Sequence, residues 1–107
     1  NMKIQVNTDH NIHGHKTTIE QIEATVEAAL GHLAEHITRI EVHVSDENAK
    51  KGGDTEKRCV MEARLEKHQP IAVTEEAASL DEAVEGAAQK LKRLLDHTLG
   101  RLSDHKT

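Results

Sequence analysis

Apolar residues recur along this chain with two different spacings, and the order of those spacings strongly restricts the possible folds. Four segments have an apolar residue at every second position, which is typical of strands with one buried face. These segments are Met2–Thr8, Arg39–Ser45, Lys57–Lys67 and a short one that begins at Ile71. Two longer segments have an apolar residue at every third or fourth position and predict amphipathic helices. The predicted order of elements is therefore β-α-β-β-β-α.

Each predicted helix begins with residues that have the spacing of a capping box, in which a hydroxyl and a carboxylate satisfy free N–H groups. Thr17 and Glu20 mark the first helix, which we expect to end near His36, and Ser79 and Glu82 mark the second. Each helix carries one apolar stripe that should face a common core. The first stripe consists of Ile19, Ile22, Val26, Ala29, Leu30, Leu33 and Ile37, and the second of Leu80, Ala83, Val84, Ala87, Ala88, Leu91, Leu94, Leu95 and Leu102.

These elements predict an α+β fold, a four-stranded sheet with two helices packed on one face. A right-handed crossover through the first helix makes the first two strands parallel, and the later strands should form an antiparallel meander. Only one sheet face is apolar, so both helices must cover it. In the third strand this face carries Cys59, Met61, Ala63 and Leu65. At 107 residues the chain suits one domain, which we expect to span residues 2–106.

Composition limits the chemistry available to the chain. It contains no Phe, Trp or Tyr, so the core must be aliphatic and no aromatic ring can stack on a base. A net charge of −5 favours solubility and argues against broad, nonspecific binding to DNA or other nucleic acids. The only cysteine, Cys59, excludes an intramolecular disulfide and fits a reducing compartment. The sequence shows neither a signal segment nor an apolar run of about 20 residues, so we expect a cytoplasmic protein with no membrane partner.

Charge is distributed unevenly along the second helix. Residues 75–87 contain five acids and no base, whereas residues 88–107 contain five bases and two acids. Complementarity to the helix dipole accounts for such a pattern without any ligand. The other interpretation is a basic strip along one helical side that contacts phosphates, at positions i, i+3, i+7 and i+11. This strip consists of Lys90, Arg93, His97 and Arg101, and the candidate rRNA-binding site adds Lys92.

Nine histidines raise the question of a metal site. Residues 10–15 hold three of them, and His32 and His36 would lie one turn apart on an α-helix, a spacing that can hold zinc or nickel. The sequence brings no further ligand to them, so exposed histidines with incidental metal affinity are the simpler interpretation, and we expect no metal or other cofactor. Cys59 faces inward, and the chain has no P-loop and no recognisable nucleophile motif. We therefore expect a protein that is not an enzyme.

The second helical segment resembles the closing helix of a known family. The stretch Ser79–Leu95 opens with acids and leads into Lys90-Leu91-Lys92-Arg93. It is similar to the Lys-Leu-x-Arg core of the bacterial ribosome hibernation-promoting factor and ribosome-associated inhibitor family, whose members are also called ribosomal subunit interface proteins or sigma-54 modulation proteins. Residues 45–48, 51–53 and 57–64 look like a short-form branch of that family. The likeness extends over nearly the whole chain.

This resemblance implies a fold like that of double-stranded-RNA-binding domains. It also implies binding in the mRNA and tRNA channel of the small (30S) ribosomal subunit under stress, which would block translation. Family members use bases of the closing helix against rRNA; Lys90, Arg93 and Arg101 match such positions, and His97 occupies one where a base is common.

The chain also departs from the family pattern. Glu23, Ala29 and His32 stand where the family's first helix usually carries bases. Two alternatives to ribosome binding therefore stay open. One is a protein–protein interaction module of the same fold that has lost rRNA binding, and the other is a histidine-based, metal-responsive protein.

Overall fold

The structure, a computed structural model, describes residues 2–9, 12, 15–46 and 57–104, without the side chains of residues 15 and 101–104. The order of its elements confirms the predicted β-α-β-β-β-α arrangement. They are strand β1 (Lys3–Thr8), helix α1 (His15–Leu30), the 3-10 helix η1 (Gly31–His36), strands β2 (Ile37–Asp46), β3 (Lys57–Leu65) and β4 (Ile71–Ala77), and helix α2 (Leu80–Asp104).

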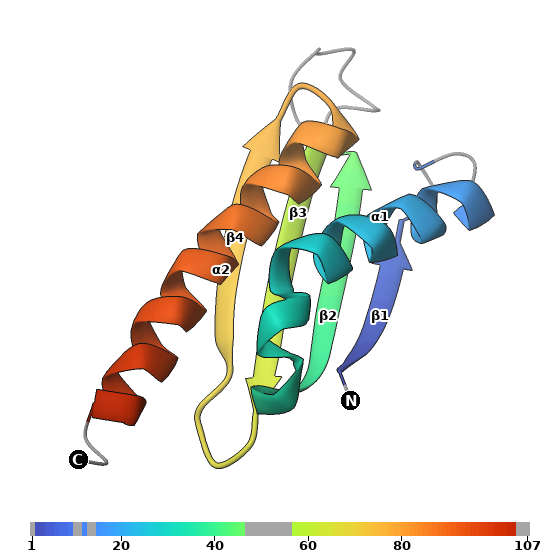
Figure 1. The fold of residues 1–107 in the computed structure, drawn as a ribbon. Helices are drawn as coiled ribbons and strands as arrows, with labels where there is room; N and C mark the ends of the chain where they lie inside the picture. Colours follow the sequence, from blue (N-terminus) through green and yellow to red (C-terminus); the bar gives the residue numbers. More distant parts are fainter. Residues whose placement is uncertain (1, 10–11, 13–14, 47–56, 105–107) are drawn as a thin grey trace.

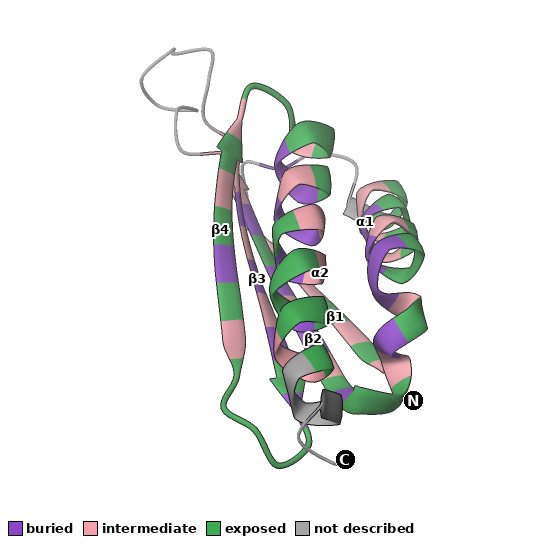
Figure 2. Cartoon of the chain, turned by 60° about the vertical axis from the view of Figure 1, so that its left-hand side comes forward, coloured by how far each residue is buried: buried purple, intermediate pink, exposed green. Residues whose placement is uncertain are grey.

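The strands form one sheet in the order β1-β2-β3-β4. Strands β1 and β2 are parallel, as expected for a crossover through α1, whereas β3 is antiparallel to both β2 and β4. Both helices cover the same face of the sheet (Figure 1), and the buried residues lie between the two layers (Figure 2). The predicted α+β architecture, with helices on one face only, is therefore confirmed.

The core-facing residues of the two central strands are those that the alternation predicts. Ile40, Val42 and Val44 are at most 2% exposed in β2, and Cys59 and Met61 are fully buried in β3. A shift of the register by one residue would have turned all of these side chains to solvent. The apolar pattern of the strands therefore decides which sheet face the helices cover.

The thiol of Cys59 should react slowly with a maleimide in the native protein and rapidly in denaturant. Cys59 is fully buried, and burial, aided by the negative charge of Glu75, raises the pKa of the thiol to about 12. The thiolate is the nucleophile, so the native protein contains very little of the reactive form near neutral pH. Mass spectrometry of the labelled protein would follow both rates, and equal rates would show that the strand register is wrong.

The first helix differs from the prediction at both ends. It begins at His15, so Thr17–Glu20 lies inside its first turns and does not cap it. The α-helix ends at Leu30, and the segment as far as His36 is a 3-10 helix, not a continuation of the α-helix. Gly31 stands at this change, and glycine is about 1 kcal/mol less favourable than alanine inside an α-helix.

Several strand boundaries also differ from the prediction. Ile37, expected on the first helical stripe, is the first residue of β2 and is buried there. Strand β3 ends at Leu65 instead of Lys67, because Lys67 has a φ of 59° and belongs to a turn. Strand β4 is longer than the expected short segment and continues to Ala77, which pairs with the first residue of β3.

The prediction for the apolar stripe of α2 is wrong at one described side chain, Leu94, and the side chain of Leu102 lies outside the described residues. Leu91 is fully buried, whereas Leu94 is 45% exposed. A step of three residues turns an α-helix by about 300°, which moves Leu94 from the centre of the buried side to its flank. Among the described residues no helix has the length and apolar character that crossing a bilayer requires.

Candidate nucleic-acid interface

The start of α2, the helix that carries the candidate site, is fixed by local hydrogen bonds. The Glu82 N–H donates to the Ser79 hydroxyl at 3.1 Å, and this hydroxyl donates to the Glu82 carboxylate at 3.2 Å. The N-terminal cap predicted at Ser79 is therefore confirmed, although the carboxylate bonds the hydroxyl and not the backbone. Asp81 and Glu82 also place negative charge at the positive end of the helix dipole.

Arg93 and His97 lie on the exposed side of α2. Neither side chain forms a hydrogen bond or ion pair with another residue that the structure describes. Arg101 belongs to the same helix, and its side chain lies outside the described residues. The guanidinium group of Arg93 is thus available for a phosphate, which arginine can bind through two parallel hydrogen bonds.

The ammonium group of Lys90 is engaged by strand β4. Its Nζ lies 2.7 Å from Oε1 of Glu75 and donates to the carbonyl oxygen of Thr74 at 2.8 Å. Glu75 therefore neutralises the positive charge of Lys90, whereas Arg93, one turn later, has no such partner among the described residues.

Lys92 lies on a different side of α2 from the strip, next to η1. Its Nζ is 3.3 Å from Oδ2 of Asp96, and Oδ1 of the same carboxylate is 3.1 Å from Nε2 of His32. The hydrogen bond with His32, and secondarily that with Lys92, lowers the pKa of Asp96. Lys92 therefore belongs to a contact between α2 and η1, and the structure does not bring it together with the strip.

Two acids that neutralise bases of the candidate site were missed by the sequence reasoning. A signal for Glu75 was present, because the alternation of Ile71 and Val73 continues to this residue and turns it toward the helices. Asp96 follows Lys92 at the i+4 spacing of a helical ion pair. No sequence pattern around Asp96 predicts its contact with His32, which lies 64 positions away in the sequence.

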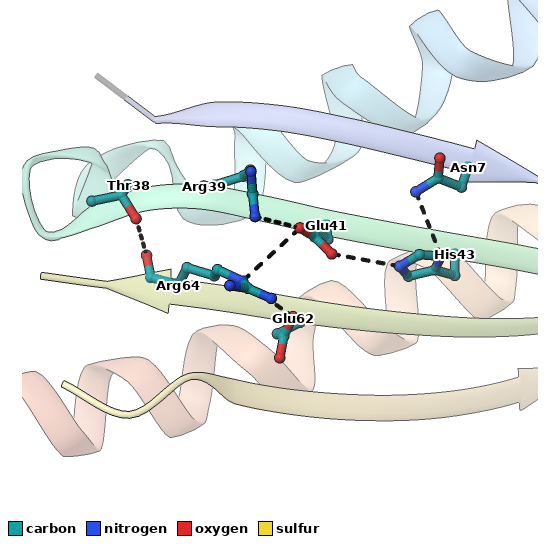
Figure 3. Close-up of polar contacts among 7 residues, drawn as sticks. All are labelled: Asn7, Thr38, Arg39, Glu41, His43, Glu62 and Arg64. Atoms are coloured by element: carbon teal, nitrogen blue, oxygen red, sulfur yellow. Dashed lines mark hydrogen bonds and ion pairs between the residues drawn. The ribbon is translucent and has the colours of Figure 1, made fainter.

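The sheet face opposite the helices carries a network of ion pairs around Glu41 (Figure 3). This carboxylate lies 2.7 Å from Arg39 Nη2, 3.9 Å from Arg64 Nε and 3.7 Å from His43 Nε2. Nε of Arg64 also lies 3.5 Å from Oε1 of Glu62. Each base of this network thus has a carboxylate partner, which favours a solvated surface over a phosphate-binding one.

The described residues give no support to a histidine metal site. They contain no group of three or more His, Cys, Asp or Glu side chains that could hold a metal ion. Residues four apart in a 3-10 helix point about 120° apart, so His32 and His36 do not share a side as they would in an α-helix. His10, His13 and the side chain of His15 lie outside the described residues.

Both the sequence and the fold are similar to those of known proteins. A family model described as sigma 54 modulation protein / S30EA ribosomal protein matches residues 10–103. The N-terminal domain of protein Y from Thermus thermophilus has a similar structure, with a TM-score of 0.73 and 18% identity over 91% of this chain and 99% of that chain. A ribosomal subunit interface protein from Coxiella burnetii has a TM-score of 0.72 and 16% identity over 92% and 99% of the two chains. No curated protein matches the sequence.

Proposed function

The chain belongs to the sigma 54 modulation protein / S30EA ribosomal protein family, and from that membership we propose that it binds the small ribosomal subunit and represses translation under stress. The family match confirms the resemblance drawn from the closing helix. It is also the observation that carries the proposal, because it extends from residue 10 to residue 103 and so includes both helices and three of the four strands.

The surface proposed to contact rRNA is the side of α2 that carries Arg93, His97 and Arg101. Arg93 and His97 are exposed and unpaired among the described residues, and Arg101 follows them at the spacing of the same helical side. Lysine and arginine side chains there would neutralise backbone phosphates without reading base sequence. The protein would act by occupying its site on the subunit and not by catalysis, in the cytoplasm where ribosomes work.

Because the net charge of the chain is negative, the proposed contact with rRNA depends on the bases of α2 that lie near the phosphates. The net charge is −5, and the carboxylates of Glu75 and Asp96 already neutralise Lys90 and Lys92. Charges separated by more than about 8 Å are largely screened at physiological ionic strength. A short row of bases can therefore bind phosphates although the whole protein is acidic.

Wild-type protein should co-sediment with isolated 30S subunits in a sucrose gradient, and its affinity should fall as salt is added. If Arg93 and Arg101 each neutralise one phosphate, the plot of log affinity against log salt should have a slope of about −2. Affinity measured by sedimentation at several potassium chloride concentrations would test this. Absence of binding at low salt would overturn the proposed function, and binding that does not depend on salt would indicate a contact with ribosomal protein in place of rRNA.

A further inference from the structure

The contact between Lys90 and β4 depends on a charged partner, Glu75, and on the close packing of Glu75 against Gly86. Glu75 lies on the helix-facing side of its strand, and its half-buried side chain is 28% exposed. Its carboxylate lies 2.7 Å from the Lys90 ammonium group, and the Thr74 carbonyl oxygen accepts from the same group at 2.8 Å. A hydrogen bond between charged partners is stronger than one to a neutral carbonyl. Glu75 is therefore the main restraint on Lys90.

Gly86 makes room for this contact. A Cβ atom at position 86 would lie 2.6 Å from Oε2 of Glu75 and 2.8 Å from its Cδ and Cγ atoms. These distances are shorter than real Cβ contacts allow, so any side chain at this position would displace the Glu75 carboxylate. The absence of a side chain at Gly86 thus lets Glu75 pass beside α2 and reach Lys90, one turn further along the helix. Figure 2 shows α2 beside β4 in this arrangement.

We propose that Glu75 is a positioning residue that restrains Lys90 at the sheet edge and so sets the affinity of the α2 strip for rRNA; this inference rests on the ribosome binding proposed above. With Glu75 charged and in place, Lys90 adds no net charge to the strip. Without it, the ammonium group can turn toward a phosphate, and the strip gains about one phosphate contact.

The neighbouring residue provides a matched control. Glu76 follows Glu75 directly, is exposed, and lies on the opposite sheet face because side chains alternate along a strand. Glu75→Gln and Glu76→Gln change the net charge equally, and only the first removes the carboxylate from Lys90. Gly86→Ala offers a third, independent variant, since it displaces Glu75 while keeping its charge. Alanine is favourable inside a helix, so this variant should remain folded.

The restraint on Lys90 can be measured without the ribosome. The probe is acetylation by N-hydroxysuccinimidyl acetate, which reacts with free amines, followed by proteolysis and mass spectrometry. Lys90 should be acetylated several-fold faster in Glu75→Gln and in Gly86→Ala than in the wild type, relative to the other lysines of the same molecule. Glu76→Gln should leave the rate unchanged. Equal Lys90 rates in all four proteins would overturn the inference.

The effect on affinity is measured with isolated 30S subunits. Glu75→Gln should bind about fivefold more tightly at about 0.15 M salt, and its salt slope should steepen by about 0.9, the increment of one phosphate contact. Glu76→Gln should change affinity by less than twofold. In a Lys90→Gln background most of the gain from Glu75→Gln should disappear, because the two side chains act as a pair.

The outcomes separate this inference from the proposed function. If the wild type binds 30S subunits and the two Gln variants bind equally tightly, the inference is wrong and ribosome binding stands. If neither the wild type nor any variant binds at low salt, the proposed function is wrong, and with it the role of Glu75 in rRNA affinity. Faster acetylation of Lys90 together with tighter binding by Glu75→Gln supports both.

Discussion

Replacing Leu91 by alanine should lower the free energy of unfolding by about 2–5 kcal/mol. Leu91 is fully buried at the centre of the side of α2 that packs on the sheet. Its removal leaves a cavity between two layers that contain no aromatic side chain able to shift and fill it. Small domains are stable by about 5–15 kcal/mol, so this change could remove most of the total. Urea denaturation followed by circular dichroism would measure it, since the chain has no Trp or Tyr to report by fluorescence.

The matched control is Leu94→Ala in the same helix. Leu94 is 45% exposed, and its truncation should change the stability by no more than about 0.5 kcal/mol. Both variants remove the same atoms from the same type of helical position, so intrinsic helix propensity cancels in the comparison. A similar loss in the two variants would contradict the assignment of Leu91 to the core and of Leu94 to the flank.

The double variant Arg93→Gln/Arg101→Gln should weaken binding to 30S subunits by about 30-fold at about 0.15 M salt, if each arginine contributes one phosphate contact. Its salt slope should also become shallower by about 2. Lys90 is left unchanged because Glu75 already neutralises it. Arg93 is exposed, so its replacement should cost only a few tenths of a kcal/mol in stability. Sedimentation with 30S subunits measures the binding, and circular dichroism shows whether the fold is kept.

The control for this variant is Lys3→Gln/Lys16→Gln, which removes the same charge from the exposed surface of β1 and from the first turn of α1. It should bind within about threefold of the wild type, because screening confines electrostatic attraction to charges near the phosphates. An equal loss in both double variants would mean that net charge, and not the strip on α2, governs binding. Binding unaffected by Arg93→Gln/Arg101→Gln would refute the assigned site while leaving the family membership intact.

The inward faces of the strands could be predicted because a strand has a period of two. Once Ile40 or Met61 is assigned to the core, every second residue of the strand follows it. The cap at Ser79 could be predicted for a similar reason, since its partner lies three residues away. Features that depend on close neighbours in the chain can therefore be predicted from the order of the residues.

The predictions of secondary structure were wrong where the same apolar spacing fits two local structures. Around Gly31 the apolar spacing fits a continued α-helix, and the chain instead forms a 3-10 helix before entering β2. That change separates His32 from His36 and moves Ile37 into the sheet. The apolar pattern fixes which residues are buried, and it does not fix the hydrogen-bonding pattern that buries them.

The order of the elements, the buried faces of the strands and the family all follow from the amino-acid sequence. So does the placement of Lys90, Arg93 and His97 on one helix, because each of these features depends on the local period of the chain. Which of these bases is free depends instead on tertiary packing. Glu75 meets Lys90 because α2 packs over β4 at the position where Gly86 leaves space, and His32 meets Asp96 because η1 lies beside α2. Periodicity predicts the side of an element on which a charge lies, whereas the partner of that charge depends on how separate elements pack. The packing of α2 on β4 pairs Lys90 with Glu75 and leaves Arg93 without a partner among the described residues.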